Sequence, residues 1–433
     1  MARRQLAVVG GGWAGLAAAV AGTQAGDQLS LFEMAGQLGG RARSLPVNEG
    51  AGGGEGEDKL RLDNGQHILI GAYTRCLALL RTVGVDGDAA LLRMPLRLRY
   101  PQHEGLRLPP GPPLISFARG VLAHPTWPLA ARLQLLSTAT RWLLGGFRCA
   151  PMLTVEQLCA GLSPVINAEL IAPLCVAALN TPAPRASAQV FLRVLHDALF
   201  SGPGSADLLL PRLSLSALLA VPAAAWLQAR GADIRLGSRV QTITPHGHGW
   251  RVDGQAFDTV ILACPSGEAA RLIAPLNPDW AASAAALSFE PIITVYLQSP
   301  GSRLPAPMVA LQDGEADPAQ FIFDLRQLGH TTDLFAMVVS GAAPWVARGL
   351  AATGAAALAQ ARRELCWHTP PQVLRVLAER RATFACTPGL QRPAANIAPN
   401  LIAAGDYVAG PYPATLEGAV RSGEAAVSRR NTG

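Results

Sequence analysis

Lysine is almost absent from this 433-residue chain: Lys59 is the only one, so the net charge of +6 is carried by arginine. Charged residues make up only 15% of the sequence. The arginines are scattered rather than clustered beside stacking aromatic residues, which argues against nucleic acid as a partner. An anionic membrane surface suits a basic chain that is 50% hydrophobic better. Uninterrupted apolar runs long enough to span a bilayer are also missing.

Paired metal-binding and redox motifs are missing as well. The seven cysteines include no C-x-x-C pair and are odd in number, which predicts reduced thiols of a cytosolic protein. The eight histidines form neither an H-x-x-x-H nor an H-E-x-x-H arrangement. We therefore expect no metal.

What the sequence does contain is a nucleotide-binding unit near its start. Residues 6–33 read as strand, glycine turn, helix and strand. Gly10, Gly12 and Gly15 have the G-x-G-x-x-G spacing, and Trp13 and Ala14 open the helix whose free N–H groups would face a pyrophosphate. About 20 residues further on, Glu33 ends the second strand, where a carboxylate can accept hydrogen bonds from ribose hydroxyls.

A second glycine motif follows at residues 36–44, GQLGGRARS. It resembles the second fingerprint of the flavin amine oxidase and phytoene desaturase superfamily. The resemblance implies that Gly39 and Gly40 allow close backbone approach to FAD and that Arg41 faces its phosphates. The combination favours FAD over NAD. Residues 50–58 are expected to form an acidic, low-complexity loop.

The stretch DNGQHILIGAYT at residues 63–74 resembles the squalene-associated branch of this superfamily, the bacterial hydroxysqualene dehydroxylases. The resemblance implies that Asp63, Gly65, Gln66 and His67 lie beside the flavin ring. His67 is the first candidate for a catalytic proton donor, with Tyr73, Tyr407 and Tyr412 behind it. The alternative is that His67 is a structural hydrogen bonder.

The C-terminal motif at residues 400–426 reads as strand, Gly-Asp, loop and helix. In the resembled superfamily Asp406, after Gly405, binds the ribityl and phosphate region of FAD. The helix that starts at Thr415 and Leu416 would direct its N–H groups at the flavin. Val240 occupies the position whose backbone contacts adenine in that superfamily.

Between these motifs the chain is apolar. Residues 114–147 mix leucine, isoleucine and tryptophan with arginine and contain no acid, which is typical of helices in a lipid interface. A pair of core-facing helices with a solvated basic side is an equally good interpretation. The whole region 96–219 has few charged residues and suits a long hydrocarbon ligand.

The predicted fold is α/β: a Rossmann-like FAD-binding domain of the glutathione reductase type with an inserted α+β substrate domain that carries apolar helices. The FAD domain is expected in three parts, at residues 1–95, 220–275 and 391–433. The helical, membrane-facing region is expected at 96–219, and the substrate-domain sheet and helix at 276–390.

By resemblance, the function is removal of the allylic hydroxyl of hydroxysqualene by reduced FAD, giving squalene for hopanoid biosynthesis. A carotenoid-type desaturase stays open as an alternative, as does a flavin-free prenyl-lipid escort protein. An amine oxidase would need an aromatic cage, and the chain has only five tyrosines. The expected partners are the isoprenoid substrate, an unidentified electron donor and the inner membrane, touched peripherally from the cytoplasm.

Overall fold

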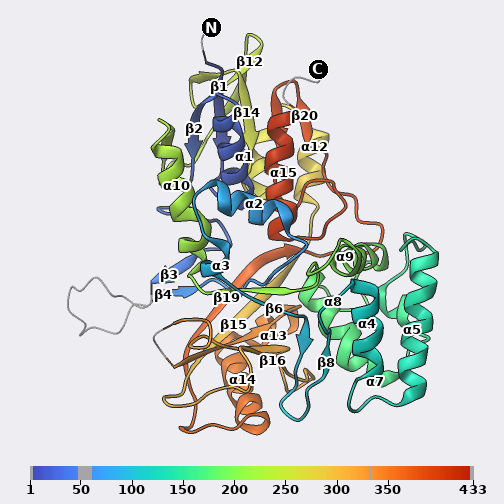
Figure 1. Cartoon of the computed structure of the whole chain (residues 1–433). Helices are drawn as coiled ribbons and strands as arrows, with labels where there is room; N and C mark the ends of the chain where they lie inside the picture. Colours follow the sequence, from blue (N-terminus) through green and yellow to red (C-terminus); the bar gives the residue numbers. More distant parts are fainter. Residues whose placement is uncertain (1–2, 47–60, 331–332, 430–433) are drawn as a thin grey trace.

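The computed structural model describes residues 3–46, 61–330 and 333–429. The acidic loop expected at residues 50–58 lies outside these ranges. Figure 1 shows three parts: a sheet domain at one end, where the described chain begins and finishes, a second sheet with helices at the other end, and a lobe of helices beside the second sheet.

A six-stranded sheet forms the centre of the first part, and its strands come from widely separated segments of the chain. Their order is β10–β2–β1–β14–β21–β20, with all neighbours parallel except β20 and β21. The strands are β1 (Gln5–Val9), β2 (Gln28–Phe32), β10 (Asp233–Arg235), β14 (Thr259–Leu262), β20 (Asn396–Ala398) and β21 (Leu401–Ala403). Because both chain ends and the middle contribute, the sheet brings distant motifs to one edge.

Alternate residues of β1 enter two different cores, as the period of a strand requires. Leu6 and Val8 pack into a core formed by four helices, whereas Ala7 and Val9 face a separate core that includes a three-stranded sheet. The helices are α1 (Trp13–Gln24), α2 (Thr74–Thr82), α10 (Val221–Gln228) and α15 (Leu416–Ser428); the small sheet is β11 (Ile243–His246), β12 (Gly249–Val252) and β13 (Gln255–Phe257). Helices α11 (Ser266–Ile273) and α12 (Pro278–Ala285) follow β14.

An antiparallel sheet of order β16–β17–β18–β15–β19 forms the second part. Its strands are β15 (Phe289–Gln298), β16 (Met308–Ala310), β17 (Phe321–Asp324), β18 (Leu334–Val339) and β19 (Gln372–Phe384). Helices α13 (Ala343–Arg348) and α14 (Leu350–Glu364) join residues of this sheet in one apolar core. Strand β19 leads from this sheet back toward the first domain (Figure 1).

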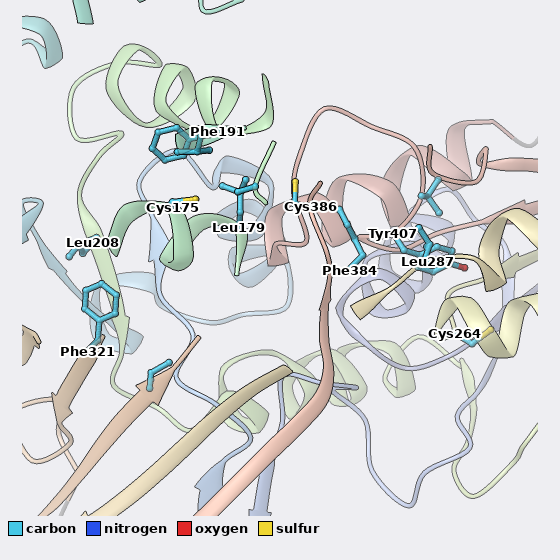
Figure 2. Close-up of a cluster of buried hydrophobic side chains, with 14 of the residues drawn as sticks. Cys175, Leu179, Phe191, Leu208, Cys264, Leu287, Phe321, Phe384, Cys386 and Tyr407 are labelled. Carbon is cyan, nitrogen blue, oxygen red and sulfur yellow. The ribbon is translucent and has the colours of Figure 1, made fainter. Parts of the chain in front are cut away.

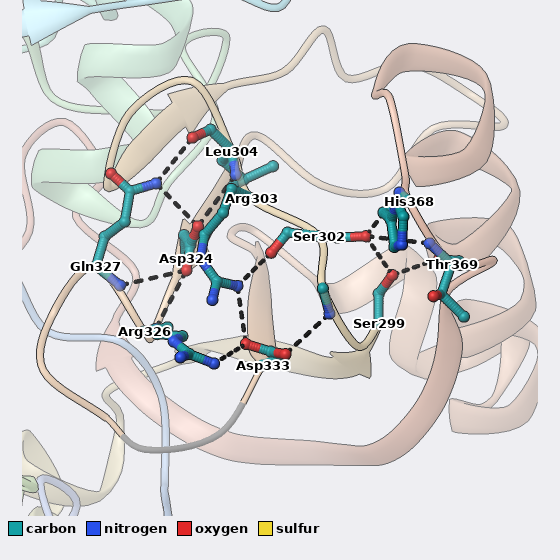
Figure 3. A network of polar contacts seen from close by, with 11 residues as sticks. Ser299, Ser302, Arg303, Leu304, Asp324, Arg326, Gln327, Asp333, His368 and Thr369 are labelled. Atoms are coloured by element: carbon teal, nitrogen blue, oxygen red, sulfur yellow. Dashed lines mark hydrogen bonds and ion pairs between the residues drawn. The ribbon is translucent and has the colours of Figure 1, made fainter.

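Asp324, which is buried, and Asp333, which forms two ion pairs, hold the loops at one end of the strands of this sheet (Figure 3). Asp324 accepts from the Leu304 N–H at 3.0 Å and from Gln327 Nε2 at 2.8 Å. Asp333 pairs with Arg303 and Arg326, each at 2.8 Å, and these donors together with the Gly301 N–H hold the pKa of its carboxyl well below the usual range. Such a charge-assisted network gives the turns a defined conformation.

The helical lobe lies beside this sheet (Figure 1). It contains α4 (Pro113–Leu122), α5 (Leu129–Leu144), α6 (Val155–Cys159), α7 (Pro164–Ile166), the π-helical turn η1 (Asn167–Ile171), α8 (Ala172–Leu179) and α9 (Ala188–Phe200). A second π-helical turn, η2 (Ser216–Ala220), leads into α10.

Short strands connect the parts. They are β3 (Ser44–Pro46) with β4 (Arg61–Asp63); β5 (Leu69–Ile70), β9 (Leu208–Pro211) and β6 (Leu91–Met94); and β7 (Arg97–Leu98) with β8 (Leu106–Arg107). Helix α3 (Gly87–Ala90) precedes β6. Within the described ranges, no helix has the length and apolar character needed to cross a bilayer.

Candidate functional site

The glycine turn after β1 is too tight for side chains. Gly10 has φ of +109°, and a Cβ there would lie 2.6 Å from the Ala263 carbonyl oxygen. A Cβ on Gly15 would lie 1.8 Å from the Gly10 oxygen, because the first turn of α1 packs directly on the strand. These are the steric roles that the fingerprint assigns to its first and third glycines.

Glu33 organises this turn from the end of β2. Its Oε2 accepts from the Gly11 N–H at 2.6 Å and its Oε1 from the Ala35 N–H at 2.8 Å. The side chain is 7% exposed. A carboxylate offers about four lone-pair sites, so Glu33 can hold the loop and still accept ribose hydroxyls.

The two N-terminal glycine motifs meet face to face. Gly12 and Gly39 form an isolated parallel bridge, and the Gly39 N–H donates to the Gly11 oxygen at 2.9 Å. A Cβ on Gly40, whose φ is +60°, would approach Gly12 Cα to 3.0 Å. The backbone of these glycines, which carries no side chains, therefore faces the start of α1, and Trp13 and Ala14 are the first residues of that helix. A helix N-terminus beside bare backbone is a phosphate-binding arrangement.

Arg41 joins this motif to the C-terminal one. Its Nη2 pairs with Asp406 Oδ1 at 2.6 Å, and its Nη1 donates to the Ala382 oxygen at 2.7 Å. Asp406 follows β21 after Gly405, whose N–H donates to Ser422 on α15 at 3.0 Å. Arg41 is predicted to face the phosphates of FAD and Asp406 to bind its ribityl and phosphate region, and the structure brings these two residues together.

Helix α15 begins at the same place. Thr415 caps it by accepting from the Gly418 N–H at 3.0 Å, and Leu416 is its first residue. A Cβ on Gly423 would lie 2.1 Å from the Ala14 oxygen, so α15 packs closely against α1. The two helices that would face the cofactor with positive N-terminal dipoles are therefore neighbours.

The Gly65–His67 stretch follows β4 and is anchored by Asp63. Asp63 Oδ1 accepts from Ser44 Oγ at 2.6 Å and from the Leu215 N–H at 3.0 Å, while burial raises the pKa of this carboxyl to about 6. Gln66 Nε2 donates to the Tyr296 hydroxyl at 3.3 Å, and that hydroxyl donates to the Asp63 carbonyl at 2.8 Å. Sequence reasoning placed Asp63 beside the flavin ring by resemblance but did not predict that it anchors this stretch, because its partners Ser44 and Leu215 lie in other segments of the chain.

His67 Nδ1 lies 3.2 Å from the Gly65 carbonyl oxygen, and burial lowers the pKa of the ring. A carbonyl can only accept, so Nδ1 carries the proton and the neutral ring presents a lone pair on Nε2. At neutral pH the ring is thus arranged as an acceptor rather than as an acid.

Tyr73 and Tyr412, two of the three tyrosine candidates, differ in their surroundings. Tyr73 precedes α2, and burial raises the pKa of its phenol. The ring of Tyr412 has two guanidinium groups near it, with Arg193 5.4 Å and Arg421 5.3 Å from its centroid. Sequence reasoning missed this pair of arginines, since α9 and α15 meet only in the folded chain.

Val240 is buried, and its carbonyl oxygen accepts from Arg271 Nη2 at 2.6 Å. Its predicted backbone contact with adenine stays a prediction.

Two buried polar groups of this region lack hydrogen-bond partners that a bound cofactor could supply. The buried Tyr407 hydroxyl and the Trp13 indole N–H have no hydrogen-bond partner among the described residues. Tyr407 follows Asp406, and Trp13 opens α1, so both unpartnered groups belong to the motifs that would hold FAD. Buried donors without partners are costly in a finished protein. Bare glycine backbone, two helix N-termini, Arg41 and Glu33 fit the phosphates and ribose of FAD.

Residues 13–429 match the profile of the flavin-containing amine oxidoreductases. The chain belongs to this family. FAD is its cofactor, and it is an FAD-dependent oxidoreductase, as predicted. Two solved structures share the fold of this chain. An oxidoreductase from Methanosarcina mazei has a TM-score of 0.73 at 15% identity over 98% of this chain and 100% of its own. Cyclohexylamine oxidase from Brevibacterium oxydans has a TM-score of 0.72 at 14% identity over 99% of both chains. The predicted fold class is confirmed.

Curated relatives agree with the predicted resemblance. A hydroxysqualene dehydroxylase from Rhodopseudomonas palustris is 29% identical over 97% of this chain and 96% of its own. A protein of the same name from Sinorhizobium fredii is 27% identical over 98% of this chain and 99% of its own. The similarity to this branch of the family is confirmed.

The residues that come nearest to a metal site lie elsewhere, in the helical lobe. Ligand atoms of His103, His124 and Glu169 lie within 4.8 Å of one another. Nδ1 of each histidine accepts from backbone N–H groups, and Trp127 Nε1 donates to Glu169 at 2.8 Å. A histidine that binds metal through Nε2 donates its Nδ1–H instead. The hydrogen bonds therefore favour a structural role for this cluster, and the expectation of no metal stays a prediction.

Proposed function

We propose that this chain removes the allylic hydroxyl of hydroxysqualene, giving squalene and water for hopanoid biosynthesis. The observation that carries the proposal is the nearly full-length similarity to relatives named hydroxysqualene dehydroxylase. In the reaction the hydroxyl oxygen takes up a proton and leaves as water, and the carbon receives a hydride. Reduced FAD supplies that hydride when it is bound. A separate electron donor, not yet identified, must reduce the flavin again.

Burial of apolar side chains between the three parts of the molecule supports a hydrocarbon substrate. Figure 2 shows one continuous cluster that reaches from the helical lobe to the FAD domain. Its labelled members include Leu179 and Phe191 of the lobe, Phe321 and Phe384 of the second sheet, and Tyr407 of the FAD domain. These side chains pack against one another, and a hydrocarbon that inserted among them would be stabilised by the apolar area it buries rather than by hydrogen bonds.

Tyr412 is the best-placed proton donor. The guanidinium groups of Arg193 and Arg421 lie 5.4 Å and 5.3 Å from the centroid of its ring. Arginine has only donors, so neither group takes up the phenol proton, which remains available to another acceptor. The substrate hydroxyl would be that acceptor.

His67 is a less suitable proton donor than Tyr412. Its ring is neutral and holds its Nδ1–H against Gly65. We infer that His67 fixes the backbone of the Gly65–His67 stretch against the flavin and leaves proton donation to Tyr412.

An amine substrate is disfavoured by the same arginines. Arg193 and Arg421, each paired with a carboxylate, lie 5.4 Å and 5.3 Å from the centroid of the Tyr412 ring. The ring therefore already has cationic partners and is not free to receive an ammonium group. Tyr100 and Tyr296 cannot complete an aromatic cage there, because their hydroxyls donate to the Glu169 and Asp63 carbonyls in other parts of the molecule.

The test is a single turnover without oxygen. The purified holoenzyme is reduced with dithionite, freed of excess reductant and mixed with hydroxysqualene, while flavin absorbance is followed and lipid is extracted. Reoxidation of the flavin with an equal amount of squalene is the expected result. Flavin that stays reduced, together with desaturation of an isoprenoid by the oxidised enzyme, would contradict the proposal and favour the desaturase alternative.

A further inference from the structure

The outer surface of α4 and α5 is unusually apolar. Eight of the fourteen exposed large hydrophobic side chains of the described residues lie between positions 114 and 152. They are Leu114, Ile115, Leu122, Leu129, Leu133, Leu143, Leu144 and Met152. Isolated exposed leucines are normal, but a gathered set marks an interaction surface.

Helical spacing places these side chains on one side of each helix. On α5, Leu129, Leu133 and Leu144 recur at intervals of four and eleven residues and are exposed, whereas Ala131 and Leu135 are buried. On α4, Leu114, Ile115 and Leu122 are exposed, while Gly120 and Val121 are buried. The inner faces are already packed, since α4 contacts α9 and α5 contacts α7. In Figure 1, α5 lies at the outer edge of the helical lobe, with α4 beside it.

The same stretch is strongly basic. Residues 105–155 contain five arginines and no lysine, aspartate or glutamate, so their formal charge is +5, compared with +6 for the whole chain. The arginines are Arg107, Arg119, Arg132, Arg141 and Arg148. Four of them are exposed; Arg132 is half-buried and binds the Leu122 and Trp127 carbonyls. Nearly all the net charge of the protein thus surrounds its most apolar surface.

Charge and apolar side chains alternate on one surface. Arg119 lies four residues after Ile115 and three before Leu122, and Arg141 lies three residues before Leu144. Residues at these spacings are neighbours on a helix. Arginine stems can lie along lipid while their guanidinium groups reach the headgroups.

We propose that the outer faces of α4 and α5, which we call the docking face, rest in the headgroup region of an anionic bilayer. An amphipathic pair with leucine on one side, arginine around it and no acid fits such an interface. A neutral apolar partner would leave the +5 charge of this segment without a counterpart. A protein partner would have to supply acidic side chains, whereas an anionic membrane already supplies negative charge through its lipid phosphates. The docking face is one helix layer away from α9, whose Phe191 belongs to the buried apolar cluster.

The experiment uses the full-length holoenzyme and flotation of vesicles. Vesicles of phosphatidylethanolamine with phosphatidylglycerol should carry the protein to the top of the gradient, vesicles of phosphatidylcholine alone should carry much less, and added salt should weaken binding. Replacing Ile115, Leu129 and Leu144 by serine should weaken binding about tenfold or more, and Arg119→Gln with Arg141→Gln should abolish the preference for the anionic lipid.

A matched variant controls for general loss of surface leucine. Val221, Leu236 and Leu350 are also exposed but lie outside the lobe, and their replacement by serine should leave vesicle binding unchanged. Equal loss in both triple variants, or binding that ignores lipid charge, would overturn the proposal. So would a dimer in solution that the docking-face serines dissociate, because a second copy would then cover the face. Flavin content and turnover of detergent-dispersed substrate should be normal in the serine variants, which separates a failure here from a failure of the proposed function.

Discussion

Replacing Asp63 with asparagine should stabilise the protein at neutral pH, although it removes a hydrogen-bonded charge. Oδ1 of Asp63 accepts from both Ser44 and Leu215, and a single amide oxygen can accept both bonds. The asparagine therefore keeps the anchor and removes only the buried charge.

The magnitude follows from the pKa. Burial raises the pKa of the Asp63 carboxyl from 3.8 to about 6. A raised pKa means that the folded state prefers the protonated form, so this contribution to stability is fully present below pH 3.8 and is lost as the pH rises through about 6. At about 1.36 kcal/mol per pH unit, ionised Asp63 costs up to about 3 kcal/mol at pH 8 and about 1 kcal/mol at pH 4.5.

Urea unfolding of the wild type and D63N at these two pH values measures the difference. D63N should gain up to about 3 kcal/mol at pH 8 and about 1 kcal/mol at pH 4.5. D88N, at an exposed aspartate of α3, should show no such pH-dependent gain. A D63N variant that is destabilised at pH 8 would refute the reasoning, because it would show that the carboxylate charge is stabilised in the fold rather than merely buried.

Further expected outcomes concern the cofactor site and the proton donor. E33Q should weaken FAD binding by about 10- to 100-fold in a fluorescence titration, because one backbone N–H would face the amide N–H₂ of glutamine; unchanged affinity would show that Glu33 is dispensable. R41M should destabilise the apoprotein, because Asp406 stays buried without its cation. Adding D406N should restore the stability of the apoprotein but not its affinity for FAD. Restored FAD affinity in the double variant would show that Arg41 does not bind the cofactor. Y412F should slow substrate-dependent flavin reoxidation by about 10²- to 10⁴-fold with an unaltered flavin spectrum, and H67Q should slow it less; the reverse order would return the role of acid to His67.

The parts of the site that sequence alone could predict are those set by local spacing. The turn at Gly10 and Gly15 needs glycine for steric reasons that lie within a few residues, and strand and helix follow from the pattern around it. The C-terminal Gly-Asp-helix is local in the same sense. These segments predict the fold class because each contains its own βα unit.

What could not be predicted depends on contacts between distant segments. Arg41 and Asp406 are 365 residues apart, and nothing in either motif shows that they pair. Tyr412 gains its two arginines only when α9 packs near α15.

Strand β19 was missed for the same kind of reason. Its sequence QVLRVLAERRATF has no clean alternation of apolar and polar residues. It is a strand because almost its whole length pairs with β15, and tertiary pairing overrides a weak local preference.

The most direct measurement of the central claim is isotopic. The reduced holoenzyme converts hydroxysqualene in D₂O without oxygen, and the extracted squalene is examined by mass spectrometry and deuterium NMR. Because the reducing hydrogen of the flavin exchanges with solvent, the account predicts squalene with one deuterium at the carbon that carried the hydroxyl. Squalene without deuterium at that carbon, or no squalene at all, would contradict it.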